Sequence, residues 1–214
     1  MHLISPSRTH GRALLREHLL FAIGHFVACL IGLLAKDPLT SVLCFWPAAG
    51  TALVAVTRLG WRILPALALV QIAASLLGVP ILTPVQILIL NLNCSLQAWT
   101  GAALWRRLSH LTHERRPTQR NVSLFMVVCL ALGLIGGALS TVAVWINQHP
   151  VSWTQWSQCV VAHTLGAFVM TPLLLHTSTL RARLRIAPGA VSSPSLPPPS
   201  SSRVPCSMPA WPRC

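Results

Sequence analysis

The sequence predicts an all-α protein, a polytopic transmembrane helix bundle with about six spans and both termini in the cytoplasm. The first observation is compositional: 53% of the 214 residues are hydrophobic and 9% are charged, whereas soluble domains carry roughly 25% charged residues. The second is that long apolar runs recur between residues 18 and 177. The third is that the acids Glu17, Asp37 and Glu114 are too few to coat a soluble protein of this size.

The apolar runs predict where the helices cross the bilayer. Each run is close to the roughly 20 residues that a hydrocarbon core of about 30 Å requires. The first is expected to be retained as a signal anchor rather than cleaved. The predicted spans are residues 18–35, 40–58, 63–80, 84–105, 122–146 and 157–177.

The links between the spans predict the orientation. Arginines gather in the N-terminal segment 1–17, around the turn at Arg58 and Arg62, after the fourth span and after the sixth. The remaining links contain a single basic residue, Lys36. Because basic loops stay on the cytoplasmic side, both termini are predicted to be cytoplasmic. The net charge of +13 is thereby explained without nucleic-acid binding, for which no soluble region is long enough.

Prolines occupy two kinds of position in these spans. Pro65 and Pro84 fall in a first helical turn, where a missing N–H costs nothing. Pro47 and Pro172 fall inside their spans and are predicted to kink them. Since freed carbonyls must be satisfied away from lipid, we expect the region of Pro47 to lie inside the bundle, with Gly50 allowing a close approach. The higher frequency of proline in membrane helices is an alternative explanation.

The fourth predicted span is the most polar. Gln86, Asn93, Gln97 and Thr100 fall within about 60° of one another on a helical projection. A polar stripe that faced lipid would be costly, so we expect it to face the bundle interior. Hydrogen bonding between helices and a ligand or proton site both remain open as its role.

No cofactor or metal is expected. Haem would need two facing histidines at similar depth, but His25 falls in the middle of the first span and His163 in the outer half of the sixth. His176 lies at the end of that span. The His110-x-x-His113 pair lies beside arginines that would repel a cation. The cysteines form no C-x-x-C pair and are expected to be small buried hydrophobic residues.

Three patches of the sequence carry a resemblance. The first, "FWPAAGTALVAVTRLGWRILPAL", is similar to a W-P-x-x-G segment followed by an L-G-x-R-x-x-P turn. The second, "NCSLQAWTGAALWRRL", is similar to a helix written G-N-T-L-E-A. The third, "AHTLGAFVMTPLLL", is similar to a G-D-A-L-G segment followed by P-L-L. In this order and spacing they resemble the first type of membrane-associated sensor domain, the MASE family. The matching residues are Trp46, Pro47, Gly50, Leu59, Gly60, Arg62, Pro65, Ser95, Leu96, Ala98, Leu165, Gly166, Pro172, Leu173 and Leu174.

The resemblance implies an integral-membrane sensory input domain of a bacterial signal-transduction protein, multi-pass in the inner (plasma) membrane, with residues 18–180 as the sensor-like domain. The partners it implies are the lipid bilayer, an unknown small-molecule signal and a possible homodimer. No enzymatic activity and no catalytic residue are expected, because nucleophile–base pairs and clustered carboxylates are absent from the sequence. The candidates for sensing are Trp46, Pro47, Gly50, Asn93, Gln97 and His163. The candidates for a structural role are Gly60, Arg62, Pro65, Leu165, Gly166 and Pro172.

The chain departs from the family pattern in several places. Gln97 stands where Glu is frequent and His163 where Asp is frequent, so the fixed negative charge is lost. The family tends toward more spans and is usually followed by a kinase or diguanylate cyclase module. Here the basic and then Pro/Ser-rich segment 181–214 is predicted to be disordered. These features lead us to expect a truncated copy whose tail is translated out of frame.

A small membrane transporter or transporter subunit is the alternative function. Polar and proline-interrupted spans also line substrate paths. Against it, no acid lies within a predicted span and no internal repeat is evident.

Overall fold

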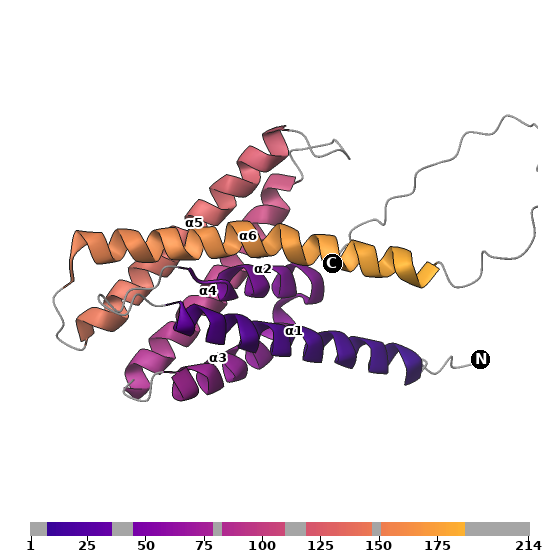
Figure 1. The fold of residues 1–214 in the computed structure, drawn as a ribbon, viewed down its shortest axis with the longest axis horizontal. Helices are drawn as coiled ribbons and strands as arrows, with labels where there is room; N and C mark the ends of the chain where they lie inside the picture. The colour runs from indigo at the N-terminus through magenta and orange to yellow at the C-terminus, as the bar shows by residue number, and fades with distance from the viewer. Residues whose placement is uncertain (1–7, 36–44, 79–82, 110–118, 147–150, 187–214) are drawn as a thin grey trace, which may run out of the picture.

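The structure is a computed structural model that describes residues 8–35, 45–78, 83–109, 119–146 and 151–186. This part of the chain is all-α and contains no strand (Figure 1). A 3-10 turn, η1 (Trp61–Ile63), joins the second and third helices. The helices are α1 (Arg8–Leu34), α2 (Ala48–Leu59), α3 (Leu64–Gly78), α4 (Pro84–Ser109), α5 (Gln119–Ile146) and α6 (Trp153–Ile186).

Four of these helices are long and apolar enough to cross a membrane, so the chain is a membrane protein. The qualifying segments are Leu14–Leu34, Pro84–Leu108, Gln119–Ile146 and Trp153–His176. The apolar helices Ala48–Leu59 and Trp61–Leu77 are shorter. At about 1.5 Å per residue, α2 rises about 18 Å, less than the hydrocarbon core. Of the six predicted spans, four therefore correspond to helices long and apolar enough to cross a membrane, and the other two correspond to shorter helices.

Pro47 does not kink a helix. It immediately precedes α2, and its carbonyl accepts a hydrogen bond from the Thr51 amide at 3.2 Å. The predicted kink is wrong because the helix begins after the proline, where a missing amide hydrogen costs nothing. Pro65 and Pro84 lie in the first turns of α3 and α4 as predicted, and Pro172 lies inside α6.

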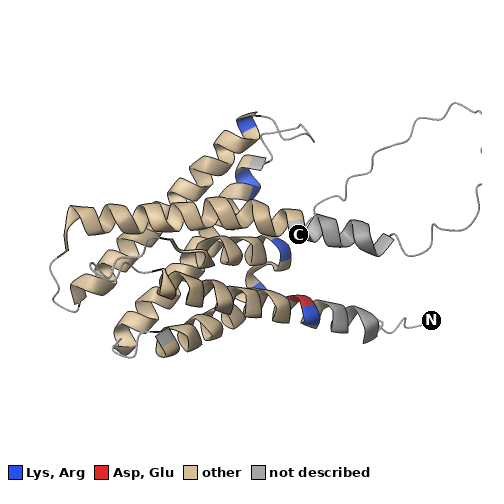
Figure 2. Cartoon of the chain, viewed as in Figure 1, with Lys and Arg blue, Asp and Glu red and all other residues tan. Residues whose placement is uncertain are grey.

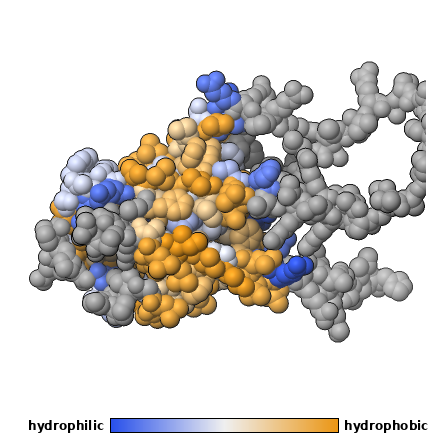
Figure 3. All heavy atoms as spheres, in the orientation of Figure 1, coloured by the Kyte–Doolittle hydropathy of each residue, from blue (hydrophilic) through white to orange (hydrophobic). Residues whose placement is uncertain are grey.

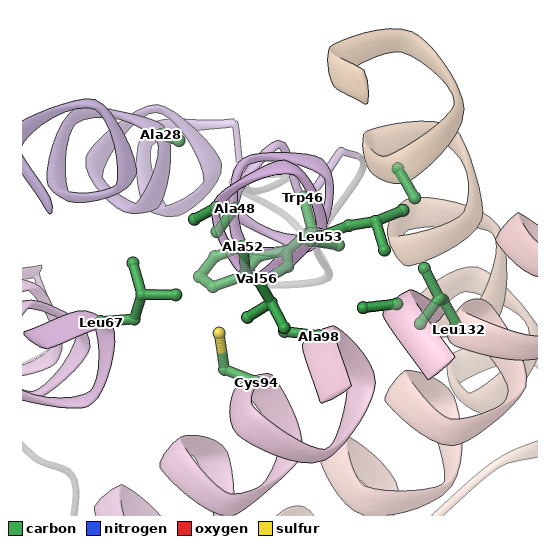
Figure 4. Close-up of a cluster of buried hydrophobic side chains, with 14 of the residues drawn as sticks. Ala28, Trp46, Ala48, Ala52, Leu53, Val56, Leu67, Cys94, Ala98 and Leu132 are labelled. Carbon is green, nitrogen blue, oxygen red and sulfur yellow. The ribbon is translucent and has the colours of Figure 1, made fainter. Parts of the chain in front are cut away.

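Helix α2 forms the centre of the bundle. Every residue from Ala48 to Val56 is buried, and the helix contacts α1, α4 and α6. The side chains from Ala48 to Val56 are small or apolar on all sides, which is the pattern of an enclosed helix. Figure 4 shows Ala52 and Val56 of α2 among side chains from four other helices, including Leu67 of α3 and Leu132 of α5. The expected inward packing of this region is confirmed.

The outside of the bundle is apolar. Leu19, Leu88, Val127 and Phe168, from four different helices, are all exposed large hydrophobic residues. Figure 3 shows apolar residues across the middle of the bundle and hydrophilic residues toward its ends. An exposed apolar surface of this extent is expected for a protein surrounded by lipid.

Charged residues gather toward one end of the bundle, where α1 begins and α6 ends (Figure 2). The only acid whose side chain is described, Glu17 of α1, interacts electrostatically with Arg58 at the end of α2. The arginines whose side chains are described are Arg16, Arg58, Arg62, Arg106, Arg107 and Arg120.

Candidate functional site

Polar side chains from α4, α5 and α6 meet in the bundle core. Asn93 donates from Nδ2 to the Gly136 carbonyl and to Ser140 Oγ, both at 3.3 Å. Gln97 donates from Nε2 to Asn93 Oδ1 at 2.6 Å. Ser140 Oγ lies 3.5 Å from His163 Nε2, the long end of the hydrogen-bonding range. We call Asn93, Gln97, Ser140 and His163 the His163 cluster; all four side chains are buried.

Glycines on α5 allow these side chains to meet. A Cβ atom at Gly136 would lie 2.6 Å from His163 Cγ and 2.9 Å from Gln97 Nε2. Gly133, about one turn earlier, lies against Thr164, and the next residue, Gly137, lies against Val160; both partners are on α6. The absence of side chains along this face brings the α5 and α6 backbones close enough for His163 to reach α4 residues.

Trp46 joins this cluster to α1 and to the start of α2. Its ring centroid lies 6.1 Å from that of His163, with the two planes tilted by 55°. Its backbone amide donates to the Ala162 carbonyl of α6 at 3.1 Å. Its indole lies against Gly32 of α1, and its carbonyl lies against Gly166 of α6. The segment before α2 is therefore held between α1 and α6.

Gly50 allows α2 and α6 to approach closely. A Cβ atom at Gly50 would lie 2.6 Å from Met170 Cβ and 2.7 Å from the Gly166 carbonyl oxygen. Pro47 is also fully buried. All six candidates for sensing thus lie inside the bundle: Trp46, Pro47 and Gly50 at the α2–α6 contact, and Asn93, Gln97 and His163 in the cluster beside it.

One nitrogen of the His163 ring has no partner. His163 Nδ1 is buried and makes no hydrogen bond with any described residue. The Ser140 hydroxyl can donate to His163 Nε2 or accept from it, because an oxygen that accepts from Asn93 keeps a second lone pair. Neutral imidazole carries one ring hydrogen, so His163 Nδ1 is a donor in the first case and an acceptor in the second. A buried donor or acceptor left unsatisfied costs about 1–3 kcal/mol.

A second polar group lies where α1, α2, α3 and α4 meet. Thr51 donates its hydroxyl to the Ala48 carbonyl at 3.0 Å, so its oxygen accepts from His25 Nδ1 at 2.8 Å. The other ring nitrogen, His25 Nε2, lies 3.6 Å from Cys94 Sγ. We call His25, Cys29, Thr51, Gln71 and Cys94 the His25 cluster.

The remaining members of the His25 cluster lie on α1 and α3. Cys29, one turn after His25 on α1, donates from Sγ to Gln71 Oε1 at 2.9 Å. His25 and Cys29 have no exposed surface, and Gln71 is buried as well.

The polar stripe on α4 faces inward as predicted. Gln86, Asn93 and Gln97 are buried and Thr100 is half-buried. Gln86 donates from Nε2 to the Ala143 carbonyl of α5 at 3.2 Å. The stripe therefore does bond helices together, which was one of its two expected roles.

The six residues expected to have a structural role occupy three kinds of position: a turn, the surface and the core. Gly60 ends α2 with φ of +75°, a conformation that favours glycine. Arg62, Pro65, Leu165 and Pro172 are exposed. Gly60 is a half-buried turn residue, so Gly166 is the one core position among these six residues.

Sequence reasoning missed most of the His25 cluster. It treated His25 as a candidate for a proton or haem site and the cysteines only as small buried residues. Cys29, Cys94, Cys129 and Cys159 are indeed buried and free, but the first two also contact polar partners. Thr51 and Gln71 are polar residues within apolar runs, a pattern that indicates hydrogen bonds inside the bundle and could have identified both.

The histidines that were considered for haem or metal binding have different surroundings. His25 and His163 bind different partners in separate clusters. Within the described ranges no group of three or more His, Cys, Asp or Glu side chains is arranged to hold a metal ion. The His110–His113 pair lies outside the described residues, and His176 is exposed near the end of the membrane segment of α6.

No protein-family model, no curated protein and no solved structure matches the chain. The resemblance to membrane-associated sensors consequently rests on the three sequence patches alone. In the structure, buried residues from all three patches lie in one region of the bundle. Trp46 contacts Gly166, and Trp46 and Gln97 both lie near His163.

Proposed function

We propose that the chain is an integral-membrane sensory input domain of a bacterial signal-transduction protein, of the first MASE type, with no enzymatic activity of its own. Its signal is a small molecule that changes how α6 packs in the bundle. The observation that carries the proposal is the buried, unpartnered His163 Nδ1, which lies beside Trp46 and next to bonded amides from α4.

The unpartnered nitrogen gives the bundle a way to respond. A small polar molecule that formed a hydrogen bond with His163 Nδ1 would satisfy a buried ring nitrogen that has no partner among the described residues. A gain of about 1–3 kcal/mol in one packing arrangement shifts a two-state equilibrium by about 5–150-fold. This range is sufficient for a sensor, and it requires no fixed carboxylate at position 97 or 163.

Helix α6 supplies a path from the cluster to an output. His163 lies in the part of α6 that crosses the membrane, and the same helix continues to Ile186 at the basic end of the bundle. The contacts of Gly166 with Trp46 and Gly50 lie between these two points. A tilt or rotation of α6 at His163 would therefore be transmitted past this contact to the end that we propose is cytoplasmic.

A chimera tests this function. Residues 1–186 are placed before a diguanylate cyclase domain, and cyclic di-GMP is measured in cells across growth conditions. We expect output that varies with conditions for the parent chimera and becomes constant for His163→Phe and Gln97→Leu. Asn91→Leu is the matched control, because Asn91 is buried on the same helix as Gln97 but, among the described residues, bonds only to the Ile87 carbonyl of its own helix. Constant output from the parent chimera would sink the proposal.

Transport remains a second candidate because of one observation, the buried amide stripe of α4. Gln86, Asn93 and Gln97 extend along about 16 Å of the helix. A transporter would admit water to this stripe, so a Gln97→Cys variant would react with a membrane-impermeant thiol reagent. Sensing by a closed bundle predicts protection at this position, and Gln155, half-buried near the start of α6, provides a positive control as Gln155→Cys.

A further inference from the structure

The His25 cluster presents a nitrogen lone pair to a thiol. The Thr51 hydroxyl donates to the Ala48 carbonyl and must therefore accept the His25 Nδ1 hydrogen. Neutral imidazole carries only one ring hydrogen, so His25 Nε2 is an acceptor. It lies 3.6 Å from Cys94 Sγ. A ring nitrogen that is fixed by a hydrogen bond from the opposite nitrogen is the usual arrangement of a histidine that binds metal.

A second thiol lies in the same neighbourhood. Cys29 follows His25 by one turn of α1, and Cys29 and Cys94 belong to the same cluster of buried residues. Gln71 from α3 accepts the Cys29 thiol hydrogen at 2.9 Å. The cluster thus brings one imidazole nitrogen into contact with one thiol, and nitrogen and sulfur donors together favour soft metal ions.

We propose that His25 Nε2 and Cys94 Sγ form a two-ligand site for a soft monovalent metal ion, Cu(I). An ion about 2.0 Å from the nitrogen and about 2.3 Å from the sulfur, as is typical of first-row metals, fits between atoms 3.6 Å apart at an angle of about 110°. A small separation of α1 and α4 would open this angle toward the linear geometry that Cu(I) accepts.

The charge balance selects a monovalent ion. The Cys94 thiol gives up its proton and its sulfur binds Cu(I), so one ion enters and one proton leaves. One thiolate, one Cu(I) and one neutral imidazole have no net charge, which suits a buried site. A divalent ion would leave an uncompensated positive charge in the bundle. Zinc also prefers four ligands, and the described residues offer no group of three.

The binding experiment uses the full-length chain in detergent under anaerobic conditions. Cys44, Cys206 and Cys214, which lie outside the described residues, are replaced by Ser to remove competing thiols. Cu(I) is then titrated against a chromophoric Cu(I) chelator. We expect one Cu(I) per chain, one proton released per ion and weaker binding at lower pH, because the proton competes with the metal for sulfur.

Variants and a spectroscopic measurement test the assigned ligands. Cys94→Ser and His25→Phe are expected to lose the bound ion, and Thr51→Val to bind about 10–100-fold more weakly because the ring is no longer oriented. Cys129→Ser, another buried thiol on α5, is the matched control and should bind as the parent does. X-ray absorption of the parent with copper bound should show nitrogen and sulfur neighbours, a result that does not depend on any variant folding.

Three results would overturn this site: no bound Cu(I) in the parent, unchanged binding by Cys94→Ser, or sulfur-only coordination in the absorption spectrum. The site does not depend on the proposed sensory function. Metal binding is measured on the chain itself and sensing on the chimera, so either can fail alone.

Discussion

Gly136 of α5 lies directly against the imidazole of His163 on α6: a Cβ atom added to this glycine would be 2.6 Å from His163 Cγ. The same atom would be 2.9 Å from Gln97 Nε2 on α4. Three helices therefore meet at a position with no room for a methyl group. Even the addition of one methyl group at position 136 should therefore disturb the packing of the His163 cluster.

Gly136→Ala is expected to destabilise the bundle. Overpacking of a filled core costs typically about 1–3 kcal/mol, and the ring and amide must both move to relieve the contact. The measurement is the free energy of unfolding in mixed detergent micelles. Gly24→Ala on α1 is the control, since a Cβ atom there would meet nothing within 4 Å. Equal losses for the two variants would show that the α5 contact is not as close as described.

Gly166→Ala is expected to be more harmful than Gly136→Ala. At Gly166 the obstructing atoms are the backbone carbonyl group of Trp46, and backbone cannot move aside by rotating a side chain. The whole segment before α2 would have to shift, including the Trp46 amide bond to Ala162. Unfolding free energies and tryptophan fluorescence should therefore rank the three variants Gly166→Ala, Gly136→Ala, Gly24→Ala, from most to least perturbed. A reversal of the first two would contradict the proposed closeness of α2 and α6.

The bond between Asn93 and Ser140 is expected to couple α4 to α5 energetically. A double-mutant cycle with Asn93→Leu and Ser140→Ala should give a coupling of about 0.6 kcal/mol, the typical value for hydrogen bonds between membrane helices. Asn91→Leu with Ser140→Ala is the control cycle, because Asn91 bonds within its own helix. Its coupling should be near zero. A zero value for both cycles would leave the cluster without a role in helix packing.

The orientation can be tested with reporter fusions. Fusions at Glu114 should report the cytoplasm, and fusions at Lys36 and His149 should report the opposite side. The reason is that the described arginines gather toward the end of the bundle where α4 ends and α5 begins, and basic residues stay on the cytoplasmic side. The fusions should be made in a bacterial inner membrane with alkaline phosphatase and a cytoplasmic reporter in parallel. Phosphatase activity at Glu114 would reverse the topology and place the end of α6 on the wrong side for a cytoplasmic output.

Composition and periodicity alone were sufficient for several features of this protein. The scarcity of charge predicted a membrane protein, and helical spacing predicted that Gln86, Asn93 and Gln97 face inward, which their burial confirms. Such predictions succeed because the cost of placing charge in lipid and the 3.6-residue repeat of the helix depend only on local sequence. The close approach at Gly50 followed from the same reasoning.

The tertiary structure alone decided where α2 begins and which polar groups meet. An apolar run does not reveal that the chain before Ala48 is held by a backbone bond from Trp46 to Ala162, so Pro47 was wrongly expected inside a helix. His25 pairs with Thr51, 26 residues away, and contacts Cys94, 69 residues away. Contacts over such separations are set by how helices pack against one another, which no local pattern in the sequence encodes.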